Sequence, residues 1–157
     1  MAKVELTEKQ KELVEKAGVN FERDGLSPAA ARTMSLLMVS DNTELTFENI
    51  YESLNMSKSA ASNAINLLLV SKRIEYITKP GDRKRYFKSR LVQLENIFEE
   101  IFKDMDSEVA VYKEILEQRP ENTKTFNEGL QDFISFMEMV KESMPQIFLK
   151  WKEGKVK

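Results

Sequence analysis

The chain has 157 residues, a formal net charge of -2, no cysteine and no histidine. The absence of cysteine excludes disulfide frameworks and thiolate metal sites, and the absence of histidine removes the usual general base and imidazole ligand. We therefore expect no enzyme activity, no metal and no cofactor, with a carboxylate- or lysine-based enzyme as the remaining alternative. The N-terminus carries no apolar leader and no apolar run approaches a membrane span, so we expect a cytoplasmic protein without membrane contact.

The charge is distributed unevenly along the chain. Residues 1–26 hold five basic and six acidic side chains, residues 27–90 hold ten and six, and residues 91–157 hold nine and fourteen. Attraction to phosphate depends on the local field, so a basic centre between acidic flanks is compatible with binding to DNA. A basic surface without a partner is the alternative.

Two helices are predicted at the start of the chain. Thr7 and Gln10 have the spacing of a capping box, and an apolar stripe follows as far as Phe21, with Gly25 as a stop signal. Ser27 and the proline after it predict a second helix, because serine caps well and proline is tolerated in the first turn. This second helix is expected to end near residues 40–42.

A helix-turn-helix is predicted next. Glu44-Leu45 is expected to pair as a very short strand, and Thr46 is expected to cap a helix from Phe47 to Leu54. The connection 55–57 has only three residues, which forces the following helix to cross steeply. That fourth helix is predicted from Lys58 to about Lys72, with Ser57 as its cap.

The fourth helix has two different faces. Its apolar positions are Ala61, Ala64, Ile65, Leu68 and Leu69, whereas Ser59, Ser62, Asn63 and Asn66 fall on the other side. Small hydroxyl and amide side chains on a helix in the major groove can reach base edges, and Lys58 with the N-terminal amides can hold a phosphate. A solvated helix face without a partner is the alternative for each polar residue.

A basic hairpin is predicted after this helix. Residues 74–78 and 85–88 have strand-like patterns, and Pro80-Gly81-Asp82 is typical of a turn. Four cations, Lys79, Arg83, Lys84 and Arg85, cluster at the tip and its flanks. A hairpin tip cannot bury four cations, so they either stay in solvent or meet phosphates, with one arginine in the minor groove. Tyr86 and Phe87 are expected to anchor this wing to the core, with stacking on bases as the alternative.

Several of these stretches resemble one protein family. They are Gly25-Leu26-Ser27-Pro28-Ala29, Leu54-Asn55-Met56-Ser57-Lys58 with Ser62, and Gly81-Asp82-Arg83-Lys84-Arg85-Tyr86-Phe87. They resemble the MarR superfamily and, within it, the GbsR-type regulators, whose wing ends in "GxRKxYY"; Phe87 stands where tyrosine is common. The resemblance implies a dimeric transcriptional repressor that responds to a small molecule such as a quaternary ammonium osmolyte.

Two long helices are predicted in the C-terminal part. A seam of apolar residues begins at Leu91 and runs to Leu116, and Pro120 ends this helix. The last helix restarts at residue 122 or 123, and Pro145 is expected to kink or shorten it. Two such apolar stripes exceed what a small winged domain can cover, so we expect them to pack between two subunits. A self-contained antiparallel hairpin folded back on its own winged domain is the alternative.

The sequence thus predicts a mostly α, α+β winged helix-turn-helix protein. Residues 1–26 form an N-terminal helix that contributes to the dimer, residues 27–90 form the DNA-binding domain, and residues 91–157 form a helical dimerisation and effector region. We expect a homodimer that binds double-stranded DNA sequence-specifically; a winged-helix protein-interaction module without specific DNA binding is the alternative. The residues predicted to contact DNA are Lys58, Ser59, Ser62, Asn63, Asn66, Lys79, Arg83, Lys84 and Arg85.

Overall fold

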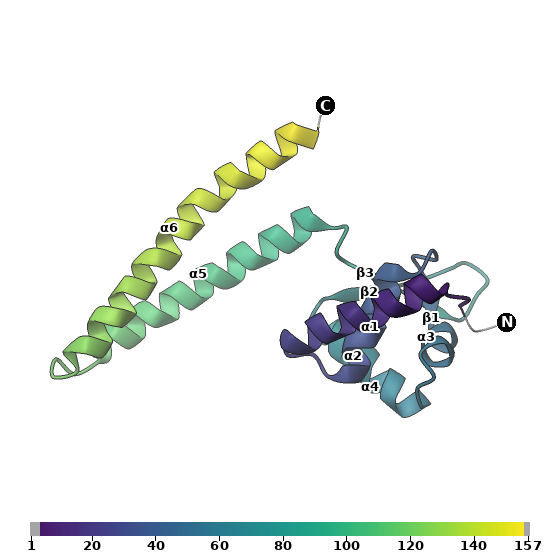
Figure 1. Ribbon diagram of the computed structural model, residues 1–157. Helices are drawn as coiled ribbons and strands as arrows, with labels where there is room; N and C mark the ends of the chain where they lie inside the picture. The colour runs from purple at the N-terminus through teal and green to yellow at the C-terminus, as the bar shows by residue number, and fades with distance from the viewer. Residues whose placement is uncertain (1–3, 156–157) are drawn as a thin grey trace. The chain divides into compact units, whose positions relative to one another are not determined.

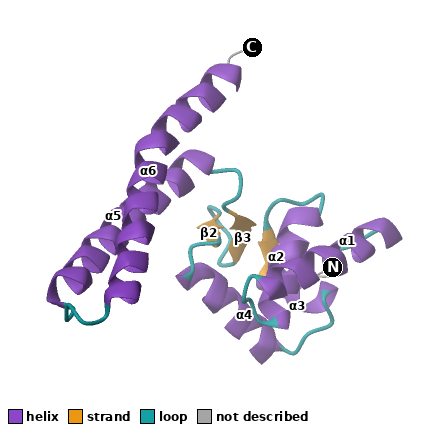
Figure 2. Ribbon diagram, turned by 60° about the vertical axis from the view of Figure 1, so that its left-hand side comes forward, coloured by secondary structure: helices purple, strands orange, loops and turns teal. Residues whose placement is uncertain are grey.

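The computed structural model describes residues 4–155 (Figures 1 and 2). The chain forms two compact units, one ending at Leu94 and the other beginning at Glu95. In chain order the elements are α1 (Glu8–Arg23), α2 (Pro28–Val39), β1 (Leu45–Thr46), α3 (Phe47–Ser53), α4 (Lys58–Val70), β2 (Ile74–Thr78), β3 (Arg85–Ser89), α5 (Leu94–Gln118) and α6 (Lys124–Lys155).

The first unit has the predicted α+β winged helix-turn-helix fold. Its helices α3 and α4 are joined by a short turn, in which Asn55 adopts a φ of 51° that asparagine tolerates better than most residues. The three strands form an antiparallel sheet in the order β1-β3-β2. In this sheet Thr46 lies opposite Tyr86. The short strand β1 therefore begins one residue later than the predicted strand Glu44-Leu45.

The predicted helix starts are confirmed at four positions. In each case the side-chain oxygen of the residue before the helix accepts the backbone N–H three residues further on, which satisfies one of the unpaired donors of the first turn. The four capping residues are Thr7, Ser27, Thr46 and Ser57.

Helix α4 ends at Val70, two residues before the predicted end. Lys72 adopts a φ of 54°. Its N–H donates to the Leu69 carbonyl at 3.0 Å, and the N–H of Arg73 donates to the Leu68 carbonyl at 2.9 Å. This pair of hydrogen bonds is the Schellman arrangement, usually built on glycine. The prediction was wrong here because a lysine fills the glycine role and gives no sequence signal for the stop.

The hydrophobic core of the first unit lies between α2, α3, α4 and the sheet. Leu36, Ile50 and Leu68 are completely buried, one from each of the three helices. Each side chain of this size contributes about 1.5–3 kcal/mol when fully removed from water. Because Phe87 of β3 belongs to the same cluster, the core holds the wing and α4 in one framework.

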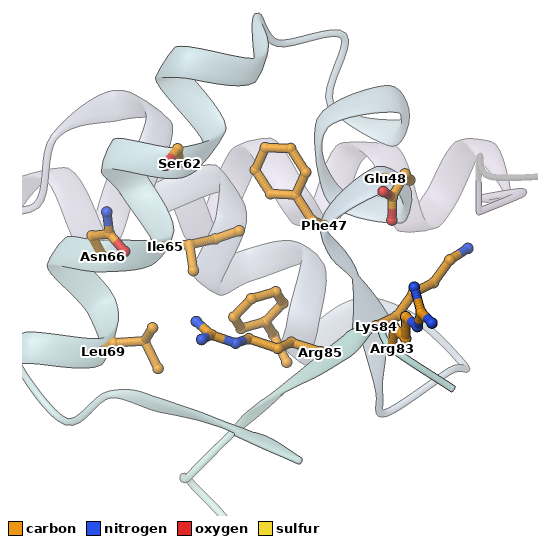
Figure 3. A pocket seen from close by; sticks show the side chains of 10 residues that line it. Phe47, Glu48, Ser62, Ile65, Asn66, Leu69, Arg83, Lys84 and Arg85 are labelled. Carbon is orange, nitrogen blue, oxygen red and sulfur yellow. The ribbon is translucent and has the colours of Figure 1, made fainter. Parts of the chain in front are cut away.

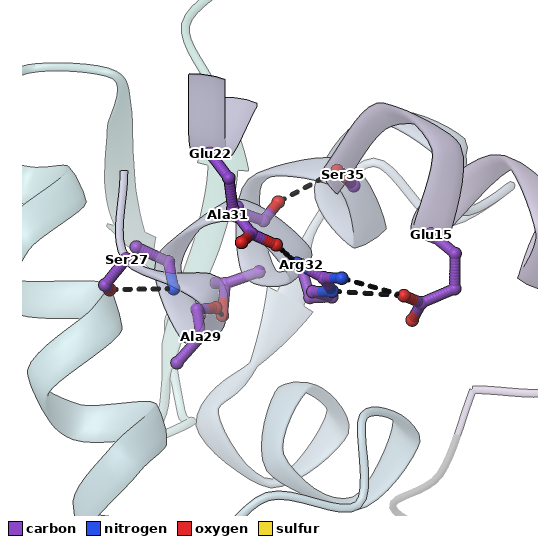
Figure 4. Close-up of polar contacts among 9 residues, drawn as sticks. Glu15, Glu22, Ser27, Ala29, Ala31, Arg32 and Ser35 are labelled. Carbon is purple, nitrogen blue, oxygen red and sulfur yellow. Dashed lines mark hydrogen bonds and ion pairs between the residues drawn. The ribbon is translucent and has the colours of Figure 1, made fainter. Parts of the chain in front are cut away.

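Helix α1 is fixed to α2 by a charged clamp (Figure 4). The guanidinium of Arg32 donates from Nη2 to Glu15 Oε2 at 3.0 Å and from Nε at 3.2 Å, and its Nη1 pairs with Glu22. A Cβ atom at Gly18 would come within 3.2 Å of Arg32 Nε. The small residue therefore allows the Arg32 side chain to lie against α1 between the two carboxylates.

The second unit is an antiparallel hairpin of α5 and α6. The rings of Phe98 and Phe148 stack with centroids 4.1 Å apart, and Tyr112 meets Phe133 edge to face at 5.5 Å. Ile134 of α6 is almost completely buried. Helices α5 and α6 of a single chain therefore pack against each other through these aromatic contacts.

Two details of these helices differ from expectation. Leu91 lies outside the helix, because α5 begins at Leu94, and its side chain is exposed. Pro145 does not shorten α6, which continues to Lys155. No helix among residues 4–155 has the length and apolar character needed to cross a bilayer.

The hairpin leaves a second apolar surface uncovered. Phe136 is 55% exposed and Ile147 is 61% exposed, although both are large apolar side chains. The large apolar residues exposed on the two helices are Leu94, Ile101, Val111, Ile115, Phe126, Phe133, Phe136, Met139, Ile147 and Leu149. Contact between α5 and α6 in one chain is thus insufficient to bury both apolar stripes.

Candidate nucleic-acid interface

A groove of about 410 Å³ lies between α4 and the wing. Figure 3 shows the α4 side chains on one side and those of the wing on the other. The lining residues are Phe47, Glu48, Ser62, Ile65, Asn66, Leu69, Arg83, Lys84, Arg85 and Phe87. The groove therefore combines hydrogen-bonding groups of a helix with the cations of a hairpin.

The polar face of α4 is exposed as the helical periodicity predicts. Ser62, Asn63 and Asn66 are all exposed, whereas Ala61 and Ala64 are buried. Ser62 and Asn66 line the groove, and Asn63 does not. The structure thus brings two of the predicted base-reading residues together with the wing.

The start of α4 uses its hydroxyl groups internally. The side chain of Ser57 caps the helix, and its Oγ lies 3.0 Å from the Oγ of Ser59. Lys58 places its ammonium 5.5 Å from the centre of the Tyr51 ring and remains exposed. Lys58 is therefore positioned beside the N-terminal amides of the helix, while Ser59 has a hydrogen-bond partner within the chain.

The wing turn is held by a network around Asp82. The N–H of Asp82 donates to the Lys79 carbonyl at 3.0 Å, and Gly81 has a φ of 78°, as a type II turn with proline before glycine requires. The carboxylate of Asp82 accepts the hydroxyl of Tyr86 at 2.6 Å and the N–H of Lys84 at 2.9 Å. The Tyr86 hydroxyl, and then the Lys84 N–H, lower the pKa of the Asp82 carboxyl.

Successive residues of β3 point to opposite faces of the sheet. Phe87 is 5% exposed and belongs to the core, as predicted, and Arg85 shares its face. The guanidinium of Arg85 lies 4.6 Å from the centre of the Tyr76 ring. Tyr86 points to the other face and is only half-buried, so the expectation that it also anchors the wing to the core was wrong.

The four wing cations have different surroundings. Arg83 and Lys84 are exposed, and within residues 4–155 their side chains form no ion pair. Lys79 instead pairs with Glu44 at 2.8 Å and lies 4.1 Å from the centre of the Tyr86 ring. The hydrogen bond from Lys79 to Glu44 raises the pKa of the Lys79 ammonium. The charges of Arg83 and Lys84 are thus exposed and uncompensated by an ion pair, whereas that of Lys79 is paired.

Sequence reasoning missed the contribution of α3 to the groove. Phe47 and Glu48 come from its first turn and reach the groove because β1, directly before them, pairs with the wing strand β3. The Glu48 carboxylate is the single acidic side chain among the described residues that line the groove. A carboxylate in a DNA groove can accept a hydrogen bond from the amino group of cytosine. No local pattern marks these residues, because their position depends on a strand pairing across forty residues.

Comparison with known proteins supports the fold. No family model and no curated protein matches the chain. The chain is similar to a crystal structure of a transcriptional regulator, with a TM-score of 0.70 and 23% identity, covering 90% of this chain and 99% of that chain. Weaker similarities are to the MepR–DNA complex of S. aureus (TM-score 0.42, 19% identity, 81% and 91% covered) and to AdcR from Streptococcus pyogenes (0.40, 21%, 83% and 96%). Only the first similarity is close enough to bear on the fold, and it agrees with the winged helix described above.

Proposed function

We propose that the protein is a cytoplasmic transcriptional regulator that binds double-stranded DNA sequence-specifically as a homodimer. The observation that carries this proposal is the groove that Ser62 and Asn66 of α4 line together with three cations of the wing. In Figure 3 Arg85 extends toward α4, whereas Arg83 and Lys84 lie on the opposite side and point away from it. Such a pairing of a polar helix face with a cationic hairpin suits a duplex, which offers base edges beside phosphates.

The two elements have different roles in this proposal. Helix α4 enters the major groove, where Asn66 can bond to an adenine in bidentate fashion and Ser62 and Asn63 contact neighbouring base edges. Lys58 binds a phosphate near the helix N-terminus, where the helix dipole and free amides also favour an anion. Arg83 and Lys84 contact phosphates from the wing, and Arg85 extends from the wing toward α4 (Figure 3).

The homodimer is proposed from the apolar surface that the α5–α6 hairpin leaves open. Side chains such as Phe136 and Ile147 would meet their equivalents in a second subunit, which removes them from water. In this arrangement residues 27–90 are the DNA-binding domain, and residues 1–26 and 91–157 contribute to the dimer. Two winged domains would then read inverted half-sites about one helical turn apart.

The finer assignment to a GbsR-type repressor is supported by the motif residues in α4 and the wing. The proposed quaternary ammonium effector would require a cage of aromatic rings. In a single hairpin, Phe148 stacks on Trp151, Tyr112 meets Phe133, and Phe126 lies beneath Arg119. Because 22 residues of α6 span about 33 Å, Phe126 and Phe148 cannot share one cage within a chain. An effector site would therefore use one of these groups.

A protein-interaction module is the second candidate, and two residues of α4 favour it. Leu67 is 42% exposed and Val70 is 82% exposed, on a helix that otherwise separates polar and apolar residues well. Exposed apolar anchors of this kind are typical of protein-binding surfaces. They lie outside the groove, however, so they do not account for the cations of the wing tip.

The proposal is tested by binding of the full-length protein to a library of genomic fragments at low salt. We expect selective retention of fragments that share an inverted repeat, with an affinity that falls steeply as salt rises. Random DNA of the same length is the control for sequence preference, and light scattering measures the oligomeric state. Absence of binding at low salt would refute the regulator and leave the interaction module.

A further inference from the structure

The outer face of the wing carries a row of three side chains from three strands or their ends. Glu44 precedes β1, Tyr86 lies in the central strand β3, and Lys79 follows β2. The Lys79 ammonium lies 2.8 Å from the Glu44 carboxylate and 4.1 Å from the centre of the Tyr86 ring. The lysine therefore reaches across the central strand to the far edge of the sheet.

The same tyrosine is fixed at its other end. Its hydroxyl donates to Asp82 at 2.6 Å, and Asp82 also accepts the N–H of Lys84. The ring that supports Lys79 is thus held by the wing turn itself. Cation–π contact and ion pairing act on one ammonium together, which makes its position more defined than that of an isolated surface lysine.

We propose that Glu44 limits the affinity of the wing for DNA by holding Lys79 away from the phosphates. This inference rests on the proposed function. Lys79 directly precedes the turn, and its four-carbon side chain is long enough to serve the tip if it is released. While it is paired with Glu44, its charge is compensated, and Arg83 and Lys84 act as the phosphate contacts of the tip.

Removal of Lys79 and removal of Glu44 should have unequal effects on DNA binding. Lys79→Met should leave the salt slope unchanged, because the paired ammonium contacts no phosphate, and should weaken binding only through the uncompensated Glu44 charge that it leaves. Glu44→Gln should tighten binding by about two- to fivefold for each wing, the range of an exposed ion pair. It should also steepen the salt dependence by about 0.9 for each new phosphate contact.

The pair Glu75 and Lys88 provides a matched control. These residues form an ion pair at 3.0 Å between β2 and β3, further from the turn. Glu75→Gln therefore removes the same charge from the same sheet without freeing a lysine at the tip. It should change affinity less than Glu44→Gln and leave the salt slope unaltered.

The experiment measures DNA affinity against salt for the wild type, Glu44→Gln, Lys79→Met, the double variant and Glu75→Gln. Loss of the Glu44→Gln gain in the double variant would support the inference, because that gain must come through Lys79. A Lys79→Met protein with a shallower salt slope than the wild type would overturn it, as would an equal gain from Glu75→Gln or a gain that persists without Lys79. In the free protein, the proton signals next to the Lys79 nitrogen should be shielded by the Tyr86 ring and should lose this shielding in Glu44→Gln. If these signals are shielded as expected but the wild type binds no DNA, the proposed function has failed while the ion pair itself is confirmed. If they are not shielded in the wild type, the inference is overturned independently of any DNA measurement.

Discussion

Simultaneous replacement of Arg83 and Lys84 by alanine tests the central assignment of the wing. Both side chains are exposed at the turn, and the turn is held by Asp82 and Tyr86 rather than by the two cations. The double variant should therefore fold normally. If each cation neutralises one phosphate in each of two wings, four contacts are lost and the salt slope falls by about 3.6.

This change in slope is large enough to measure. Between 50 and 200 mM salt, a difference of about 3.6 in slope means that the wild type loses about 150-fold more affinity than the variant. Fluorescence anisotropy with a labelled fragment, titrated at several salt concentrations, gives both slopes. Replacement of Lys124 and Lys150 in α6, which are also exposed, removes the same charge and serves as the control. Equal slopes for the wing variant and the wild type would refute the phosphate contacts.

Three further predictions concern other parts of the chain. Asn66→Ala should cost about 1–3 kcal/mol on the preferred sequence and little on random DNA, as measured by competition binding, because the amide is proposed to read a base. Phe136→Lys should give a monomer by light scattering with an unchanged circular dichroism spectrum, because this side chain is 55% exposed in the single chain. Leu68→Ala should lower the free energy of unfolding by about 2–5 kcal/mol in a denaturant titration, because it leaves a cavity in the core.

The turn network predicts a dependence on pH. The hydrogen bond from Tyr86 lowers the pKa of the Asp82 carboxyl, so this interaction stabilises the folded wing above the ordinary pKa of aspartate. Its contribution should be lost as the pH falls through the lowered value. Chemical shifts of the wing amides, followed during acidification, should report this loss. Tyr86→Phe should move the Asp82 transition to higher pH, and an unmoved transition would contradict the network.

The elements whose signals are local were predictable from the sequence. Thr46 and Ser57 announce helix starts because a cap acts over three residues, and Gly81 marks a turn because few other residues accept its φ. The polar face of α4 follows from helical periodicity alone. These features place α4 and the wing correctly, and with them most residues of the groove.

The interactions that the sequence could not supply are the long-range ones. Lys79 and Arg83 look equivalent in the sequence, but only the structure shows that Glu44, thirty-five residues earlier, pairs with the lysine. Tyr86 and Phe87 were assigned together to the core, although neighbours in a strand must face opposite ways. The sequence did not predict that Glu48 lines the groove, because its position depends on the pairing of β1 with β3.

Thr46 has a consequence for how the molecule can be altered. Its backbone pairs with Tyr86 in the sheet, and its side chain caps α3, so the last strand residue is also the start of the helix. No linker residue separates strand β1, which pairs with the wing, from helix α3. The distance between the wing and α4 is therefore fixed by the backbone around Thr46. Exchange of all the outward-facing residues of α4 should preserve this spacing. Insertion of a single residue after Thr46 should instead separate the pairing of β1 with β3 from the start of α3.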